Sequence, residues 1–185
     1  MLFRSGPRGQ GGRGKGRRLP ARALPFECYH VAAIGMEFLL GAVCFGASQV
    51  AIVATERDAE AYVAALRSQM AVAEAILHGL GYEGEHFVLV DGDALEEGLW
   101  ALVPAATVAK AATFHLSPEK RTSLDLCFDA LARGGREKPA AIPLPAGAAF
   151  GAITVDPQAC TLCKACVGAC PESALLDAQD APELR

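Results

Sequence analysis

The sequence lacks the residue patterns that mark most enzyme classes. No nucleophile, base and orienting residue stand together at the spacing of a catalytic set. Residues 79–84 spell G-x-G-x-x-G, but they follow an expected helix and precede an expected strand, the reverse of a dinucleotide-binding fingerprint. Residues 9–15 nearly spell a phosphate-binding loop, but Gly16 stands where that loop needs Ser or Thr. These absences predict that the chain is not an enzyme by itself.

The sequence also lacks the cysteine pattern of a disulfide framework. It contains seven cysteines, an odd number, and four of them lie in one motif near the C-terminus. We expect Cys44 and Cys127 to pack as small core residues on apolar helix faces. We expect Cys28 to be structural too, with a metal-binding pair of Cys28 and His30 as the alternative. Cysteine thiolates persist in a reducing compartment, which predicts a cytoplasmic protein.

Histidine is scarce, and the sequence gives it no clear role. Three of the four histidines have no partner at the spacing of metal ligands or of a catalytic triad: His78, His86 and His115. Glu96 and Glu97 are adjacent, which is typical of a solvated helix face rather than of a catalytic pair.

The first 25 residues contain no acidic side chain and no apolar periodicity. They hold seven of the 17 Lys and Arg residues, so residues 26–185 carry ten basic against 21 acidic side chains, a net charge of −11. We expect residues 1–25 to be a disordered, basic Gly/Arg-rich tail whose removal leaves stability unchanged. No aromatic residue beyond Phe3 is interleaved with the arginines, so nucleic-acid binding is not expected.

A long apolar run, Val31–Ala47, follows this basic segment and raises the alternatives of a signal peptide or a membrane span. Glu37 would be costly inside a membrane, and no small-x-small cleavage site closes the run. Residues 46–49 break it in two. We therefore expect a buried helix over residues 31–45, a buried strand over Val50–Ala54, and no membrane span.

Helices and strands are predicted to alternate through residues 26–135, which favours an α/β domain with an open, at least partly parallel sheet. Apolar spacing and end signals predict the following elements: helices over 58–80, 95–102 and 117–133, and a further strand over 86–90. Residues 107–115 fit either a strand or an irregular crossover. Residues 136–150 are rich in Pro, Ala and Gly, and we interpret them as a linker to a C-terminal module, residues 151–185.

One motif carries chemistry. Cys160, Cys163, Cys166 and Cys170, followed by Pro171, spell C-x2-C-x2-C-x3-C-P. Three thiolates at this spacing can converge on a cubane 4Fe-4S cluster, and the fourth normally faces a second cluster. Structural zinc usually has two well-separated C-x2-C pairs, whereas this run is continuous. The motif predicts a 4Fe-4S cluster bound by these four cysteines; a zinc–thiolate site or a free thiol cluster is the alternative.

Around this motif, residues 150–185 resemble the first half of a bacterial two-cluster ferredoxin domain. The resemblance implies a strand at Ile153–Val155 before the cysteine loop and a helix beginning at Pro171–Leu175 after it. A second motif should follow, but the sequence ends at Arg185, so it looks like a truncated part of a larger bacterial iron–sulfur protein with a labile or 3Fe cluster. The layout of residues 26–135 is similar to the Rossmann-like module of such proteins and of hydrogenase delta-type subunits.

Together these observations predict an electron-transfer protein or subunit that relays electrons to a partner oxidoreductase, alone or in a multi-cluster complex. An acidic body suits docking on basic partners. Two alternatives stay open. In one, the α/β domain is the cofactor-binding, active part of a dehydrogenase-like complex. In the other, the cysteine module is a structural zinc–thiolate interaction domain.

Overall fold

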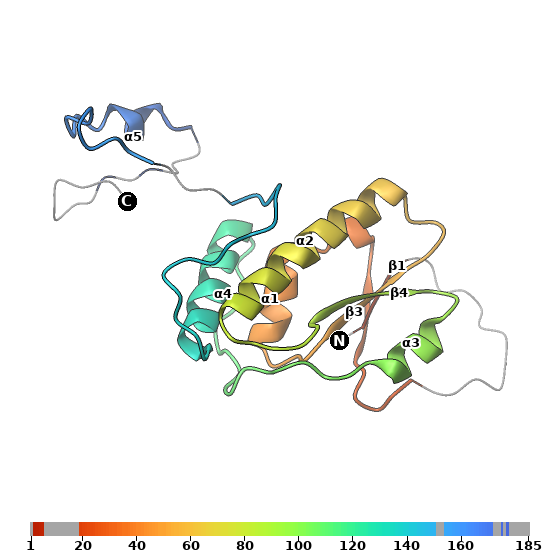
Figure 1. Ribbon diagram of the computed structural model, residues 1–185. Coiled ribbons are helices and arrows are strands. Elements are labelled where there is room, and N and C mark those ends of the chain that lie inside the picture. Colours follow the sequence, from red (N-terminus) through yellow and green to blue (C-terminus); the bar gives the residue numbers. More distant parts are fainter. Residues whose placement is uncertain (1, 6–18, 151–153, 172–174, 176, 178–185) are drawn as a thin grey trace. The chain divides into compact units, whose positions relative to one another are not determined.

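The computed structural model describes residues 2–5, 19–150, 154–171, 175 and 177. The chain divides into two compact units, Met1–Ala148 and Ala149–Arg185 (Figure 1). The first unit is the α/β domain that the alternation of helices and strands predicted. The second contains the cysteine motif.

Four parallel strands form the sheet of the first unit, in the order β2-β1-β3-β4. Their bounds are β1 Leu2–Ser5, β2 Pro25–Cys28, β3 Val50–Ala54 and β4 Phe87–Asp91. The predicted strands at 50–54 and 86–90 are confirmed, the second within one residue. All three pairings are parallel, so each neighbouring strand is reached by a crossover connection.

Strand β1 lies inside the segment that we expected to be a disordered tail. Leu2 pairs with Pro25 of β2 on one side and with Ala51 of β3 on the other. The expectation is therefore wrong for residues 2–5 and also for residues 19–25, where Pro20 is buried and Pro25 begins β2. Residues 6–18 lie outside the described part of the chain. Backbone N–H and C=O groups make a sheet ladder, so four residues can form a strand without a recognisable side-chain pattern.

The helices of the described residues are α1 Met36–Cys44, α2 Glu60–Gly79, α3 Leu95–Ala101, α4 Lys120–Gly134 and α5 Ala165–Ala169, with a short 3-10 helix, η1, at Val31–Ala33. The helices predicted over 58–80, 95–102 and 117–133 are confirmed within three residues. The helix expected over 31–45 is divided, because Gly35 is extended and begins α1 as its N-cap. Residues 107–115, for which the sequence left a strand or an irregular crossover open, form no strand.

None of the helices among the described residues has the length and apolar character that crossing a membrane requires.

Strand β3 is buried on both faces. Val50 and Ile52 belong to the main core, which also contains the buried faces of α1, α2 and α4. Ala51 and Val53 point to the opposite face and join a smaller cluster with Leu99 of α3. Helices therefore cover both faces of the sheet (Figure 1), and this explains why β3 reads as a continuous apolar run.

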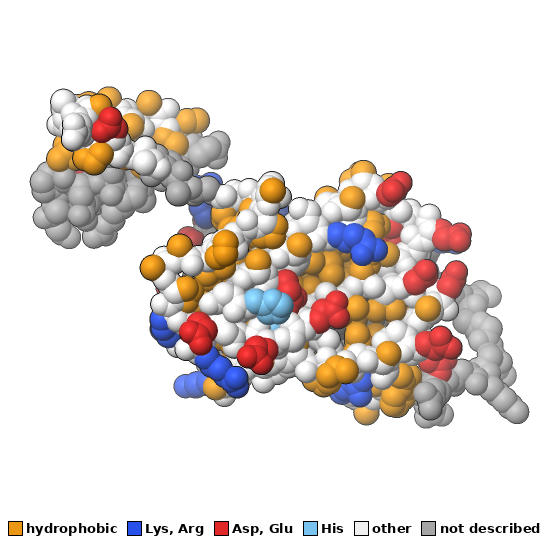
Figure 2. All heavy atoms as spheres, in the orientation of Figure 1, with side chains coloured by type: hydrophobic (Ala, Val, Ile, Leu, Met, Phe, Trp, Pro, Cys, Tyr) orange, Lys and Arg blue, Asp and Glu red, His pale blue; other side chains and the backbone are white. Residues whose placement is uncertain are grey.

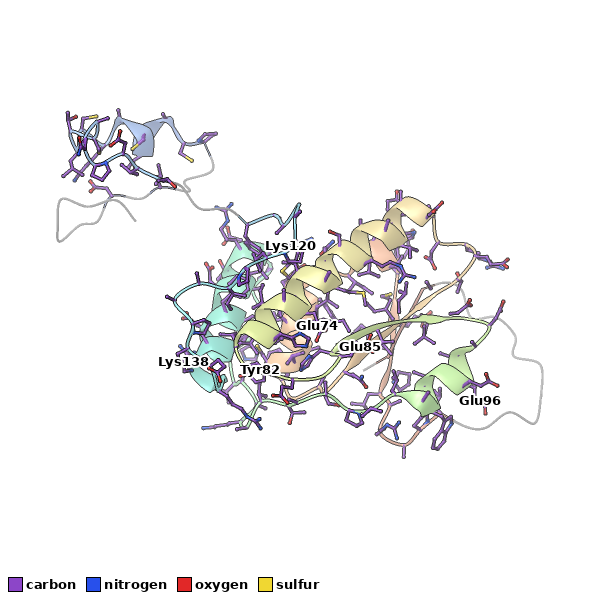
Figure 3. All side chains as sticks on the ribbon, in the orientation of Figure 1. Glu74, Tyr82, Glu85, Glu96, Lys120 and Lys138 are labelled. Carbon is purple, nitrogen blue, oxygen red and sulfur yellow. The ribbon has the colours of Figure 1, made fainter. Side chains whose placement is uncertain are left out.

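The predicted linker packs on the α/β unit as far as residue 148. Ile142 and Leu144 pack against the main core, and a Cβ on Gly79 would lie only 2.7 Å from the Ile142 side chain. Lys138, labelled in Figure 3, donates to the carbonyl groups of Ala132 and Arg133 and so caps the end of α4. The Pro, Ala and Gly content correctly predicted that residues 136–150 form no helix or strand. The segment nevertheless packs against the main core.

Gly84 ends the turn that brings the chain from α2 back to the sheet. Its φ is +103°, and a Cβ there would lie 2.8 Å from the Ala105 Cα. We expect Gly84→Ala to lower the free energy of unfolding by about 2–3 kcal/mol, because left-handed strain adds to a backbone clash. Gly147→Ala is the control, since Gly147 has φ +83° but open space around it, and should cost about 1 kcal/mol. Urea unfolding curves measure both; equal losses would contradict the clash.

Candidate functional site

The cysteine loop begins with a turn at Asp156. The Asp156 side chain accepts a hydrogen bond from the Gln158 N–H at 2.9 Å, and its carbonyl oxygen accepts one from the Cys160 N–H at 3.0 Å. An aspartate side chain that bonds the backbone two residues ahead is a common way to start a tight turn. The turn fixes the entry of the chain at the first cysteine of the motif.

Two left-handed residues then bend the loop between the cysteines. Leu162 has φ +55° and Lys164 has φ +61°, although neither is glycine. Left-handed conformations of side-chain-bearing residues carry strain and are often found at functional sites. Helix α5 starts directly after Lys164 and carries Cys166, while Cys170 follows it in an extended conformation.

The strand expected before the loop is not formed at its described residues. Residues 154 and 155 are not in a strand, and Ile153 lies outside the described residues. A short helix, α5, precedes Pro171, which is itself in a turn. The helix expected to begin at Pro171–Leu175 falls mostly on residues 172–174, which lie outside the described part. The ring of a proline disfavours helical geometry at the residue before it, so α5 ends before Cys170.

The thiol groups of the motif are accessible. Cys163 and Cys166 are exposed, and Cys160 and Cys170 are half-buried. A hydrogen bond from the Ala165 backbone N–H lowers the pKa of Cys163, and a hydrogen bond from the Thr161 side chain lowers it further. The thiolate is the form of cysteine that binds metal, so the loop favours the ligand form at Cys163.

The scattered cysteines have a different environment. Cys44 and Cys127 are 1% and 0% exposed, which confirms that they are core residues. The Cys44 thiol donates to the Cys127 carbonyl oxygen at 3.7 Å, and its hydrogen bond to the Cys127 side chain, together with burial, raises the pKa of Cys44. Burial likewise raises the pKa of Cys28. All three lie in the α/β unit.

His30 does not need a metal to explain its position. Its Nδ1 accepts a hydrogen bond from the Ala32 N–H at 3.0 Å, which caps η1. Its ring packs edge-on against the ring of Tyr62, with 5.1 Å between the two ring centroids. This supports the structural interpretation of the neighbouring residues Cys28 and His30.

The comparison with protein families identifies the loop. Residues 153–176 match the 4Fe-4S binding domain. The matched segment contains all four cysteines of the motif, and its cofactor is a 4Fe-4S cluster. Four soft thiolate donors within eleven residues, two of them exposed, fit that cofactor. No curated protein and no solved structure matches the chain.

A second cluster of side chains, in the α/β unit, was missed by the sequence reasoning. Glu74, His78 and His86 place one ligand atom each within 4.8 Å of the others. The expectation that His78 and His86 have no partner is therefore wrong. The spacing of Glu74 and His78, four residues apart on a helix, was a signal for one pair. His86 joins them only through the fold, while His115 is exposed on the irregular segment.

Proposed function

We propose that the chain is an electron-transfer protein or subunit in which Cys160, Cys163 and Cys166 bind the 4Fe-4S cluster, while Cys170, the fourth cysteine of the motif, faces a neighbouring cluster. The observation that carries this proposal is the match of residues 153–176 to a 4Fe-4S binding domain, on a loop that favours a thiolate at Cys163. The cluster, when bound, accepts and releases single electrons. The chain supplies thiolates, backbone N–H groups that can bond to sulfur, and the surroundings that tune the potential.

A partner oxidoreductase would exchange electrons with this site. Residues 26–185 have a net formal charge of −11, and acidic side chains are spread over the face of the α/β unit seen in Figure 2. Such a charge favours encounter with a basic docking surface, at a rate that falls as salt is added. The thiolate ligands suit a reducing compartment, and on that ground we place the protein in the cytoplasm.

We infer that the α/β unit is a Rossmann-like, doubly wound layer. The order β2-β1-β3-β4 corresponds to a common doubly wound order, in which ligands bind beyond the carboxyl ends of the strands. A cavity of about 420 Å³ lies there, beyond β3 and β4. Its lining includes Glu56, Glu60, Asp91 and Asp93, and one cation, Arg67. These carboxylates would repel the phosphates of a dinucleotide, so the cavity does not favour the alternative of a flavin or nicotinamide subunit.

Metal analysis tests the proposal directly. The full chain, purified or reconstituted without oxygen, should contain iron and acid-labile sulfide in equal amounts. It should also show a reversible loss of its visible absorbance on reduction. Zinc without sulfide would overturn the proposal and favour a structural zinc–thiolate domain.

The four cysteines should contribute unequally. We expect Cys170→Ser to keep more iron than Cys163→Ser, because the fourth cysteine of this motif normally faces a second cluster. Iron per chain and the EPR spectrum of the anaerobically reconstituted variants measure the difference. Equal loss in the two variants, together with four irons per monomer in the unmodified chain, would instead assign Cys170 to the same cluster as Cys163.

A further inference from the structure

We propose that Glu74, His78 and His86 form a binding site for a divalent transition-metal ion, with zinc as the metal whose preferences the site fits. The site belongs to the α/β unit and is built from residues outside the cysteine motif. It is independent of the electron-transfer function proposed above.

Two elements supply the three side chains. Glu74 and His78 lie one turn apart on the same face of α2, and His86 immediately precedes β4. Glu74, labelled in Figure 3, reaches from α2 to the backbone that opens β4. The turn that ends in Gly84 returns the chain, so that residues from a helix and a strand meet there.

The distances suit one small ion. Glu74 Oε1 lies 2.7 Å from His86 Nδ1 and 3.2 Å from His78 Nε2. Tetrahedral zinc with bonds of 2.0–2.1 Å holds its ligand atoms about 3.3 Å apart. The Glu74–His78 pair already has that separation, and the Glu74–His86 pair needs to open by roughly 0.6 Å. The third pair of ligand atoms, on His78 and His86, lies within 4.8 Å.

The surrounding backbone holds the ligands in place. Glu74 Oε2 accepts hydrogen bonds from the backbone N–H groups of His86, at 3.1 Å, and Phe87, at 3.2 Å. His86 Nε2 lies 3.0 Å from the Ala106 carbonyl oxygen. A histidine that donates one ring N–H to a carbonyl presents the lone pair of its other nitrogen, here Nδ1, toward the metal position. Metal-binding histidines are oriented in this way by their outer partners.

His86 gives the strongest reason to place a cation here. Its side chain is fully buried, and both ring nitrogens face oxygen acceptors: Glu74 Oε1 at Nδ1 and the Ala106 carbonyl at Nε2. A neutral imidazole has one N–H and can donate to only one of them. A metal ion between Nδ1 and the Glu74 carboxylate would leave neither oxygen acceptor unpaired. A metal ion at Nδ1 leaves the proton on Nε2, where the Ala106 carbonyl accepts it.

His78 completes the site on its open side. Its side chain is 52% exposed, against 19% for Glu74, so an ion can enter from solvent. His78 Nε2 also lies 2.8 Å from the Gly84 carbonyl oxygen, a contact that it would exchange for the metal. Two imidazoles and one carboxylate are a ligand set that zinc accepts while keeping a further position for water.

The experiment is a titration of the full, cluster-loaded chain with Zn²⁺ alone. Calorimetry should give one zinc per chain with no loss of iron. X-ray absorption at the zinc edge should show only nitrogen and oxygen ligands, at about 2.0–2.1 Å, without the sulfur distance of about 2.3 Å. His78→Ala and Glu74→Gln should each weaken binding by roughly a hundredfold or more, since even outer partners of a zinc ligand contribute 10- to 100-fold.

His115→Ala is the matched control, because it removes an exposed histidine outside the site and should bind zinc unchanged. His78 is exposed and Glu74→Gln keeps the side-chain shape, so both variants should fold, which circular dichroism checks. Three results would each overturn the proposal: no zinc bound, zinc bound through sulfur, or zinc affinity unchanged in His78→Ala. The first would mean that the contact between Glu74 and His86 is a hydrogen bond with no role in metal binding.

Discussion

Replacing Cys163 with serine is expected to abolish the 4Fe-4S cluster. The cysteine motif is matched by a 4Fe-4S binding domain, and the loop lowers the pKa of this thiol through the Ala165 backbone N–H. A serine hydroxyl is a harder and far less acidic ligand than the thiol it replaces. Iron, sulfide and visible absorbance of the anaerobically purified variant should all fall close to zero. The far-ultraviolet circular dichroism of the α/β unit should persist, since Cys163 lies outside it.

The buried cysteines provide the controls for this experiment. Cys44→Ala and Cys127→Ala should retain the cluster and lose only about 1 kcal/mol of stability, because each removes one small buried group. Iron that depended on Cys44 or Cys127 as strongly as on Cys163 would show that the ligand assignment is wrong.

Introducing proline at Arg4 should destabilise the α/β unit by about 3 kcal/mol or more. Arg4 pairs with Glu27 of β2 and with Val53 of β3, so β1 has a neighbour on both sides. A proline in a strand paired on both sides removes a ladder hydrogen bond and has no solvent-facing edge to occupy. A loss of this size is a large share of the free energy of unfolding of a typical folded domain, which is about 5–15 kcal/mol. Urea unfolding followed by circular dichroism measures it.

Arg4→Ala keeps the backbone N–H and should change stability by much less, which separates the strand from the side chain. Deleting residues 1–25 should be at least as damaging as Arg4→Pro, because it removes β1 entirely. A truncated chain that melts at the original temperature would contradict the pairing of β1 and restore the interpretation of a dispensable tail.

The sequence predicted the elements that carry strong local patterns. The apolar run at Val50–Ala54 and the helical spacing over residues 58–80 identified β3 and α2, and the cysteine spacing identified the cofactor. Strand β1 was missed because four residues are too few to show a period, and the Gly/Arg-rich neighbourhood pointed to disorder. The Glu74–His78–His86 cluster was missed because tertiary contact, and not spacing, brings His86 to α2.

The short helix inside the cysteine motif was not predicted from the sequence. Helix α5 covers Ala165–Ala169 and ends at Cys170, its C-cap. Proline disfavours helical geometry at the residue before it, which explains why α5 ends there. The helix that the ferredoxin resemblance implies from Pro171 onward falls mostly on residues outside the described part of the chain, so it stays a prediction.

The central place of β1 has a consequence for synthesis of the protein. This strand leaves the ribosome before either of its partners, and Ala51, which pairs with Leu2, is made much later. Parallel pairing between residues so distant in sequence is slow, because the chain loses the entropy of closing a long loop before the stabilising contacts between the strands form. A nascent chain therefore presents β1 with both edges unpaired until β2 emerges, and with one edge unpaired until β3 follows. Unpaired strand edges promote aggregation during folding, so we expect chaperone binding to protect the nascent chain in that interval.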